Sequence, residues 1–196
     1  MFRWLSLGVL VACLGISVHY RRRARIEGGT IPRAREDPLF IAARIAVALP
    51  LWLAIVVYVS NPRWMLWASF PSPEWLRWVG VGLGILSVPA AYWVFSSIGQ
   101  NVSETVLTKE HHELVTHGPY HWIRHPLYTM GLALLGGIGL MAANWFILLY
   151  CLVALIAVRM VVIPREESAL IATFGDRYRD YMGRTGAMVP KLMGRS

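Results

Sequence analysis

The sequence has little of what a disulfide-stabilised, metal-dependent or soluble nucleotide-binding protein needs. It holds two cysteines in 196 residues, and both lie inside apolar runs, which does not indicate a disulfide framework. Its six histidines are fewer than a membrane di-iron oxygenase requires. It also has no glycine-rich strand-to-helix fingerprint, which excludes the cofactor site of soluble Rossmann-fold enzymes.

What the chain has in abundance is apolar sequence. It is 56% hydrophobic, and the apolar residues form long blocks separated by short polar segments. A soluble domain of this size does not carry such blocks, so the sequence indicates an integral membrane protein. The formal net charge of +8 reflects arginines that flank the apolar blocks. That distribution is a topology signal rather than a nucleic-acid-binding surface, so we expect no nucleic-acid partner.

The N-terminus resembles a signal peptide, because Arg3 precedes an apolar run that includes a lipoprotein-like box ending at Cys13. The run continues to Val18, however, and then meets three arginines at residues 21–23. Positive charge after an apolar run retains that end in the cytoplasm, whereas a signal peptide carries its charge before the run. We therefore expect a retained membrane helix.

The apolar runs predict an all-α, polytopic membrane protein with about five transmembrane helices. The first and fourth runs are short against the ~20 residues that cross a bilayer. Only Ala143 and Asn144 separate the last two, which predicts a C-terminal helical hairpin. We divide the chain into a three-span region, residues 1–98, and a region of loop, hairpin and tail, residues 99–196. The predicted spans are Trp4–Val18, Leu39–Tyr58, Trp75–Ile98, Pro126–Ala142 and Trp145–Ile163.

Loop charges orient these spans. Residues 19–38 hold six arginines, whereas residues 61–74 hold one. Because positively charged loops stay inside, residues 19–38, residues 99–125 and the tail from Pro164 are expected in the cytoplasm, with the N-terminus outside. We expect a multi-pass protein of a bacterial inner membrane or, in a eukaryote, of the endoplasmic reticulum.

The predicted hairpin brings two polar segments together, one before it and one that begins at Arg165. If residues 165–182 form one helix, a carboxylate and two tyrosines share a face, at Glu167, Tyr178 and Tyr181. Such a face suits a ligand with a cation and an aromatic ring. The alternative is an amphipathic helix that lies on the membrane.

Histidines 117, 121 and 125 repeat every four residues and invite a metal interpretation. Gly118 and Pro119 interrupt any helix that would align them, and no cysteine lies nearby. The acids of this segment also make no recognised ligand spacing. We therefore predict no metal site.

Two blocks of polar and aromatic residues lie on either side of the hairpin. The first comprises His112-x-Leu114-Val115, Gly118-Pro119-Tyr120, Arg124-His125-Pro126-x-Tyr128 and Gly131. The second comprises Glu166-Glu167-x-x-Leu170, Phe174-Gly175, Tyr178-x-x-Tyr181 and Pro190. Together the blocks resemble the isoprenylcysteine carboxyl methyltransferase family over roughly residues 97–192. The first block alone also resembles phospholipid methyltransferases and some sterol reductases, but both blocks in order are specific.

The resemblance implies an integral membrane methyltransferase that uses S-adenosylmethionine, with residues 99–196 as its catalytic region and the active site on the cytoplasmic side. It implies that the cofactor lies between the loop and the tail, and that a lipophilic or lipidated acceptor enters from the bilayer. Arg124, Glu167 and Tyr181 are the implied catalytic residues. The implied cofactor-binding residues are His112, Leu114, Val115, Gly118, Pro119, Tyr120, His125, Pro126, Tyr128, Glu166, Glu167 and Tyr178.

The acceptor is most simply a carboxylate, such as a prenylated cysteine or a related lipid, because a carboxylate is already ionised at neutral pH. An amine would need a base, for which Glu167 or Tyr181 are candidates. Arg124 can hold a carboxylate, either of the cofactor or of the acceptor. Helix geometry favours Glu167 over Glu166 as the cofactor ligand. The alternatives are a phospholipid N-methyltransferase, an NADPH-dependent sterol-type reductase and a non-enzymatic membrane scaffold.

Overall fold

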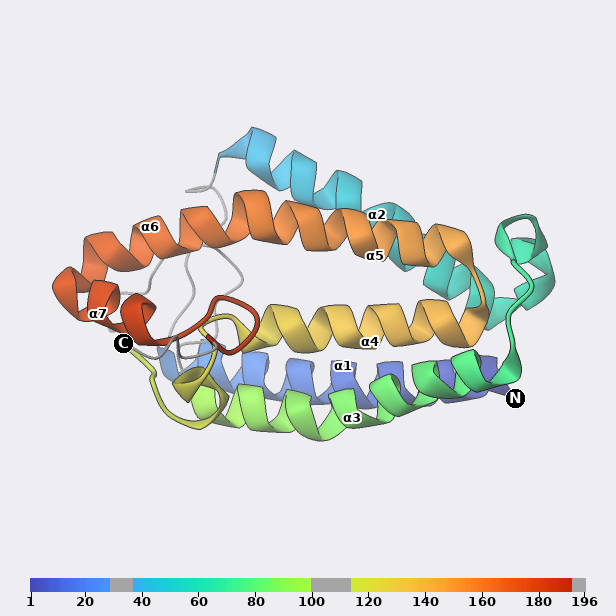
Figure 1. Ribbon diagram of the computed structural model, residues 1–196, viewed down its shortest axis with the longest axis horizontal. Coiled ribbons are helices and arrows are strands. Elements are labelled where there is room, and N and C mark those ends of the chain that lie inside the picture. The colour runs from blue at the N-terminus through green and yellow to red at the C-terminus, as the bar shows by residue number, and fades with distance from the viewer. Residues whose placement is uncertain (29–36, 100–113, 192–196) are drawn as a thin grey trace.

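The computed structural model describes residues 1–28, 37–99 and 114–191, and in these ranges the chain is helical with two isolated β-bridges. The prediction of an all-α fold is confirmed. The long helices run roughly along one axis (Figure 1). The elements are α1 (Phe2–Gly28), α2 (Pro38–Ser60), η2 (Pro62–Ala68), α3 (Glu74–Ile98), η4 (Gly118–His121), α4 (Pro126–Ala142), α5 (Trp145–Ala157), the π-helical turn η5 (Val158–Val162), α6 (Ile163–Phe174) and α7 (Asp176–Arg184).

The bundle is built around α4. In Figure 1, α4 lies between α1 and α3 on one side and the continuous rod of α5 and α6 on the other, and α2 packs on α5. The contact between α3 and α4 depends on two glycines. A Cβ on Gly80 would lie 2.6 Å from the Gly137 carbonyl oxygen, and a Cβ on Gly137 would lie 2.9 Å from the Gly80 carbonyl oxygen. Glycine at both positions therefore lets the two backbones touch, as membrane helices commonly require.

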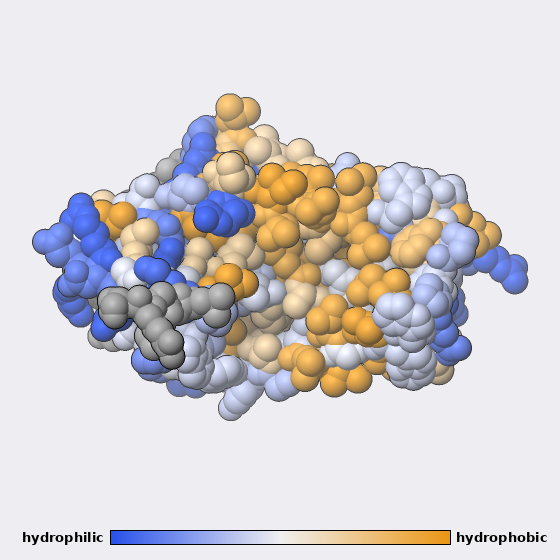
Figure 2. All heavy atoms as spheres, viewed as in Figure 1, coloured by the Kyte–Doolittle hydropathy of each residue, from blue (hydrophilic) through white to orange (hydrophobic). Residues whose placement is uncertain are grey.

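Four described helices are long and apolar enough to cross a membrane, namely Phe2–Ile26, Pro38–Ser60, Glu74–Ile98 and Trp145–Phe174. The fourth predicted span, Pro126–Ala142, is a shorter apolar helix, as expected. The first predicted span was expected to be short, which is wrong. Helix α1 continues through the arginines that follow this span and is 27 residues long. Figure 2 shows hydrophobic residues across the middle of the molecule and hydrophilic ones toward its ends. The prediction of a polytopic membrane protein is confirmed.

The predicted hairpin between α4 and α5 is also present. Ala143 turns the chain with φ 48°, and Asn144 caps α5 by accepting a hydrogen bond from the Ile147 amide at 3.1 Å. The Asn144 side chain also donates to the Met65 carbonyl at 3.3 Å, which ties the turn to η2. This end of the molecule is therefore held by side chains that satisfy backbone groups.

The sequence had led us to expect one helix over residues 165–182. The structure instead divides this segment into two helices. A π-helical turn precedes Pro164, whose missing N–H interrupts the regular ladder. The helix then ends at Phe174, and Gly175, with φ 59°, turns the chain into α7. Glycine adopts this conformation without the steric cost of a side chain.

Candidate active site

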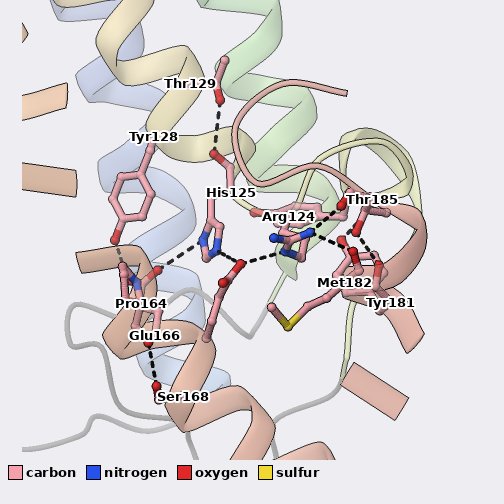
Figure 3. A network of polar contacts seen from close by, with 12 residues as sticks. Arg124, His125, Tyr128, Thr129, Pro164, Glu166, Ser168, Tyr181, Met182 and Thr185 are labelled. Atoms are coloured by element: carbon pink, nitrogen blue, oxygen red, sulfur yellow. Dashed lines mark hydrogen bonds and ion pairs between the residues drawn. The ribbon is translucent and has the colours of Figure 1, made fainter. Parts of the chain in front are cut away.

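Polar side chains from both predicted blocks meet at the end of the bundle away from the N-terminus, where α4 begins (Figures 1 and 3). The loop before α4 supplies Arg124 and His125, and the first turn of α4 supplies Tyr128. The first turns of α6 supply Glu166 and Glu167. The hairpin thus brings together groups that are about 40 residues apart in sequence, as predicted.

Arg124 connects three parts of the site. Its Nε donates to Oε1 of Glu167 at 2.7 Å, and its Nη1 donates to the backbone carbonyls of Met182 and Thr185. The side chains of Arg124 and Glu167 are only 9% and 14% exposed. Such a charge-assisted bond in a partly dehydrated place is strong, and breaking it leaves an uncompensated charge. In this arrangement, Arg124 holds a carboxylate of the protein itself.

His125 lies between two carboxylates. Its Nδ1 is 3.3 Å from Oε2 of Glu166, and its Nε2 is 3.4 Å from Oε1 of Glu167. Both ring nitrogens can donate at once only in the protonated imidazole. Burial lowers the pKa of His125, but hydrogen bonds and charge from both glutamates outweigh burial, so the pKa is raised. The site therefore favours a cationic imidazole.

Both glutamates point into the site, and the predicted ranking of Glu167 above Glu166 as the cofactor ligand stays a prediction. The Tyr128 hydroxyl donates to Oε1 of Glu166 at 2.5 Å, while Glu167 binds Arg124. Successive side chains on a helix point about 100° apart, and each carboxylate is long enough to reach an imidazole that lies between the two directions. Figure 3 shows Glu166 of α6 beside the His125 ring.

The segment after α7 closes one side of the site, although no predicted catalytic or cofactor-binding residue lies in it. Residues 123 and 186 form a parallel β-bridge. The amides of Arg124 and His125 donate to the carbonyls of Gly186 and Ala187, each at 2.9 Å. The Thr129 hydroxyl donates to the Met188 carbonyl at 2.7 Å. These contacts use mainly backbone groups, which explains why side-chain patterns did not reveal them.

The two tyrosines of α7 are buried beside this network. Tyr181 donates to the Tyr120 carbonyl at 2.5 Å. Burial, opposed by the nearby charges of Arg124 and Arg184, raises the pKa of Tyr181 to about 12. As placed, Tyr181 ties α7 to the loop and is a poor base at neutral pH. Its predicted catalytic role stays a prediction, and the bond to the Tyr120 carbonyl adds a positioning role.

Tyr178 differs from Tyr181 in having an unsatisfied hydroxyl. The residue is 1% exposed, and among the described residues its hydroxyl has no hydrogen-bond partner. Burial and the charge of Glu167 raise its pKa, so the hydroxyl stays protonated. An unpaired buried hydroxyl is costly, which is expected where a ligand completes the site.

The other predicted residues surround this network at different depths. Pro119 and Tyr120 are buried in η4, and Pro126 begins α4. Leu114 and Val115 are partly buried before η4, and His112 lies outside the described residues. Gly118 has φ 60°, and a Cβ there would lie 2.3 Å from the Ser97 hydroxyl. The close approach that Gly118 permits is therefore to α3. Among the described residues, no group of acids, histidines and cysteines could hold a metal ion.

The chain is similar to known membrane methyltransferases. A family model described as phospholipid methyltransferase matches residues 75–177. A Bacillus subtilis protein named YpbQ is 25% identical over 132 residues, which cover 65% of this chain and 71% of that protein. Protein-S-isoprenylcysteine O-methyltransferase of Tribolium castaneum is 30% identical over 127 residues, which cover 62% of this chain but 44% of that enzyme.

The fold is also similar to a solved structure. The eukaryotic intramembrane Ras methyltransferase ICMT, an isoprenylcysteine carboxyl methyltransferase, superposes with a TM-score of 0.55 and 20% sequence identity. The match covers 98% of this chain and 70% of that one. The resemblance found in the two sequence blocks is thereby confirmed, and the polytopic membrane fold is shared.

Proposed function

The chain belongs to the phospholipid methyltransferase family of membrane enzymes, and from that premise we propose that it transfers a methyl group from S-adenosylmethionine to a lipophilic acceptor. The observation that carries this proposal is the convergence of Arg124, His125, Glu166 and Glu167 at one end of the bundle. A purely structural role does not account for four ionisable groups in a largely buried place, because each costs free energy to dehydrate.

The residues present fit the cofactor. Its amino group and sulfonium are cationic, and Glu166 and Glu167 supply anionic oxygens. The Tyr178 hydroxyl supplies a buried donor that has no hydrogen-bond partner within residues 1–28, 37–99 and 114–191. When bound, S-adenosylmethionine would supply an electrophilic methyl group for transfer to the acceptor. The protein's part is to orient acceptor and donor and to exclude water.

The same groups favour a carboxylate as the acceptor. An amine acceptor needs a base, but of the two candidates the Glu167 carboxylate is bound by Arg124 and His125, and the Tyr181 hydroxyl donates to the Tyr120 carbonyl. A carboxylate needs no base, because it is already ionised. We therefore favour O-methylation of a lipid-linked acid, such as a prenylated cysteine. N-methylation of a phospholipid amine is the second candidate, because the family description names phospholipids.

Equilibrium binding to the purified protein tests the cofactor directly. We expect radiolabelled S-adenosylmethionine to bind saturably and NADPH not to compete. Methyl transfer to a farnesylated cysteine derivative and to phosphatidylethanolamine then separates the two acceptor classes. Saturable NADPH binding without S-adenosylmethionine binding would overturn the proposal in favour of a reductase, and binding of neither would favour a scaffold.

We further propose that the active site faces the cytoplasm. The six arginines of residues 19–38 support this orientation, because such charge stays inside. Single cysteines introduced at Ser69 and Ser196, after replacement of Cys13 and Cys151, should react with an impermeant reagent from opposite sides. Labelling of both from one side contradicts the five-span topology.

A further inference from the structure

The network at the start of α4 contains a group that can change its charge near neutral pH, namely His125. Two cationic side chains, Arg124 and His125, face the carboxylates of Glu166 and Glu167. Arginine stays protonated at every accessible pH, and an ionised carboxylate has no further proton to lose. An imidazole, by contrast, loses its proton close to neutral pH. A change in the charge of this network therefore falls on His125.

The position of the His125 ring favours the protonated form while the site holds no ligand. Its two nitrogens face Glu166 at 3.3 Å and Glu167 at 3.4 Å, so both contacts are attractive only while each nitrogen carries a proton. The side chain is 7% exposed, which means that the carboxylates rather than water stabilise its charge. The free site therefore holds a proton that a neutral ring would not.

The other titratable groups around the ring do not oppose the loss of this proton. Tyr128 of α4 donates its hydroxyl to Glu166. Burial raises the pKa of three further tyrosines, which stay neutral, namely Tyr120, Tyr178 and Tyr181. Cations from α1, α2 and α7 act on the tyrosine hydroxyls, namely Arg21, Arg44 and Arg184. Their positive charge adds to the repulsion that a protonated imidazole meets.

A cationic ligand at the glutamates would compete with the imidazole. S-adenosylmethionine carries an ammonium, a sulfonium and one carboxylate, so its net charge is positive. In the proposed function its cationic groups bind Glu166 and Glu167, which already face the imidazole. Two cations that share carboxylates in a largely dehydrated place repel each other strongly. Loss of the imidazole proton relieves this repulsion and leaves the carboxylates to the ligand.

We propose that the protonated imidazole of His125 neutralises Glu166 and Glu167 in the free site, and that binding of S-adenosylmethionine releases its proton to the solvent. The inference rests on the proposed function, because it requires the cofactor to bind at these two acids. One N–H bond of the ring breaks, the proton passes to the buffer, and the ring becomes neutral. Cofactor binding is then coupled to pH and is favoured as pH rises.

Isothermal titration calorimetry of the purified full-length protein in detergent measures the released proton. Binding of S-adenosylmethionine at pH 6.5 is compared in PIPES and in Bis-Tris, because the heat then differs by the number of protons that the buffer takes up. We expect release of more than about half a proton per bound cofactor, since the pKa of His125 is raised above 6.5. The cofactor's amino group is already protonated at this pH, because an α-amino group has a pKa of about 7.7–8.0. Saturable binding without proton release would overturn the inference and leave the proposed methyl transfer standing.

Two substitutions assign the proton to one residue. His125→Gln keeps a side-chain amide that can donate to a glutamate but has no proton to release, so the release should fall to near zero. His121→Gln is the matched control, because it removes an exposed imidazole that packs on Trp122 in the same loop. An equal loss of release in the two variants would contradict the assignment to His125.

S-adenosylhomocysteine separates the charge of the ligand from its shape. It lacks the methyl group and the sulfonium charge, so it should release a smaller fraction of a proton than S-adenosylmethionine does. Equal release by the two ligands would show that closure of the site, and not the charge of the ligand, expels the proton. That result would also overturn the inference.

The pH dependence of binding to the parent protein is a second measurement that needs no variant. Release of half to one proton predicts that the affinity for S-adenosylmethionine rises about three- to tenfold from pH 5.5 to pH 6.5. An affinity that stays constant or falls over this interval contradicts the proposed exchange. Absence of S-adenosylmethionine binding at every pH would overturn both the inference and the proposed function, and it is thereby distinguished from binding without proton release.

Discussion

The two ends of α4 are both held by an arginine, but in different ways. At the start of the helix, Arg124 binds the carboxylate of Glu167 and two backbone carbonyls. At its other end, Arg77 donates to the Met141 carbonyl at 2.9 Å and lies 4.0 Å from the centroid of the Phe2 ring. The first arginine joins ionisable side chains to one another, whereas the second satisfies the backbone of a helix terminus.

In our proposal, the start of α4 serves function, whereas the contact at its other end serves stability. A helix C-terminus has unpaired carbonyls and a partial negative charge, so a cation there is explained by the helix itself. At the start of α4, by contrast, three further ionisable side chains lie beside Arg124, and the helix terminus does not require them. Buried charged side chains are costly, and these do not serve to pair backbone groups. Such charges therefore indicate a ligand-binding site. Substitutions at matched positions can test whether the two ends differ in this way.

The largest expected effect is a loss of turnover when the start of α4, which we call its ionisable end, is altered. Arg124→Ala should lower methyl transfer at least ~100-fold, because the guanidinium positions Glu167 and the segment after α7 together. Arg77→Ala is the matched control and should reduce stability while turnover per folded molecule stays within about threefold. The measurement is initial-rate methyl transfer, normalised to the folded fraction. Similar losses in both variants would mean that the two ends do not differ in function.

The next effect is on stability at the opposite end. Asn144→Ala removes the cap of α5 and the bond to Met65, and it should lower the free energy of unfolding by about 2 kcal/mol. Asn144 is buried, so no water replaces the lost contacts. Asn61→Ala is the control, because Asn61 also caps a helix but lies nearer the surface, and it should cost about half as much. Unfolding in mixed micelles measures both, and equal losses would refute the role assigned to burial.

The elements that could be predicted from the sequence are those fixed by hydrophobic blocks. The spans and the turn at Ala143–Asn144 followed from runs of apolar residues and their short separation. The break between α6 and α7 was missed, although Gly175 is a known helix terminator, because the apolar and aromatic spacing continues across it. Periodicity reports which residues share a face only while the helix remains unbroken.

At the candidate site, the sequence predicted only in part which charged side chains would contact one another. The sequence indicated that Arg124, His125 and the paired acids would meet, because the hairpin requires it. It did not indicate that Arg124 would bind Glu167, since either a ligand or the protein can supply a carboxylate. The bridge between residues 123 and 186 depends on backbone groups, which every sequence has.

A smaller effect separates the two acids. Glu167 contacts two cations, Arg124 and His125, whereas Glu166 contacts His125 and Tyr128. Glu167→Gln should therefore weaken S-adenosylmethionine binding about tenfold, as expected for loss of a charged contact, and Glu166→Gln less. Titration of radiolabelled cofactor on both variants in one detergent measures the order. Near-native affinity in both variants would indicate that the acids only stabilise the start of α6.

The smallest effect is the pH dependence that His125 gives to stability. Its pKa in the folded protein is raised above 6.5, because both glutamates outweigh burial. A raised pKa means that the folded state binds the proton more tightly than the unfolded state. The stabilisation is therefore fully present below the unfolded value and is lost as pH rises through the folded value.

Unfolding midpoints measured between pH 5.5 and 9 should show this loss on the alkaline side of 6.5, and His125→Gln should remove it. His121→Gln is the matched control for the loss of an imidazole, because His121 is exposed beside Trp122 on the same loop. Removal of the pH dependence by His125→Gln alone would assign the proton to the imidazole between the two carboxylates. An unchanged profile in His125→Gln would mean that the ionisable end does not bind a proton on folding. It would then resemble the opposite end of α4, where Arg77 binds a backbone carbonyl.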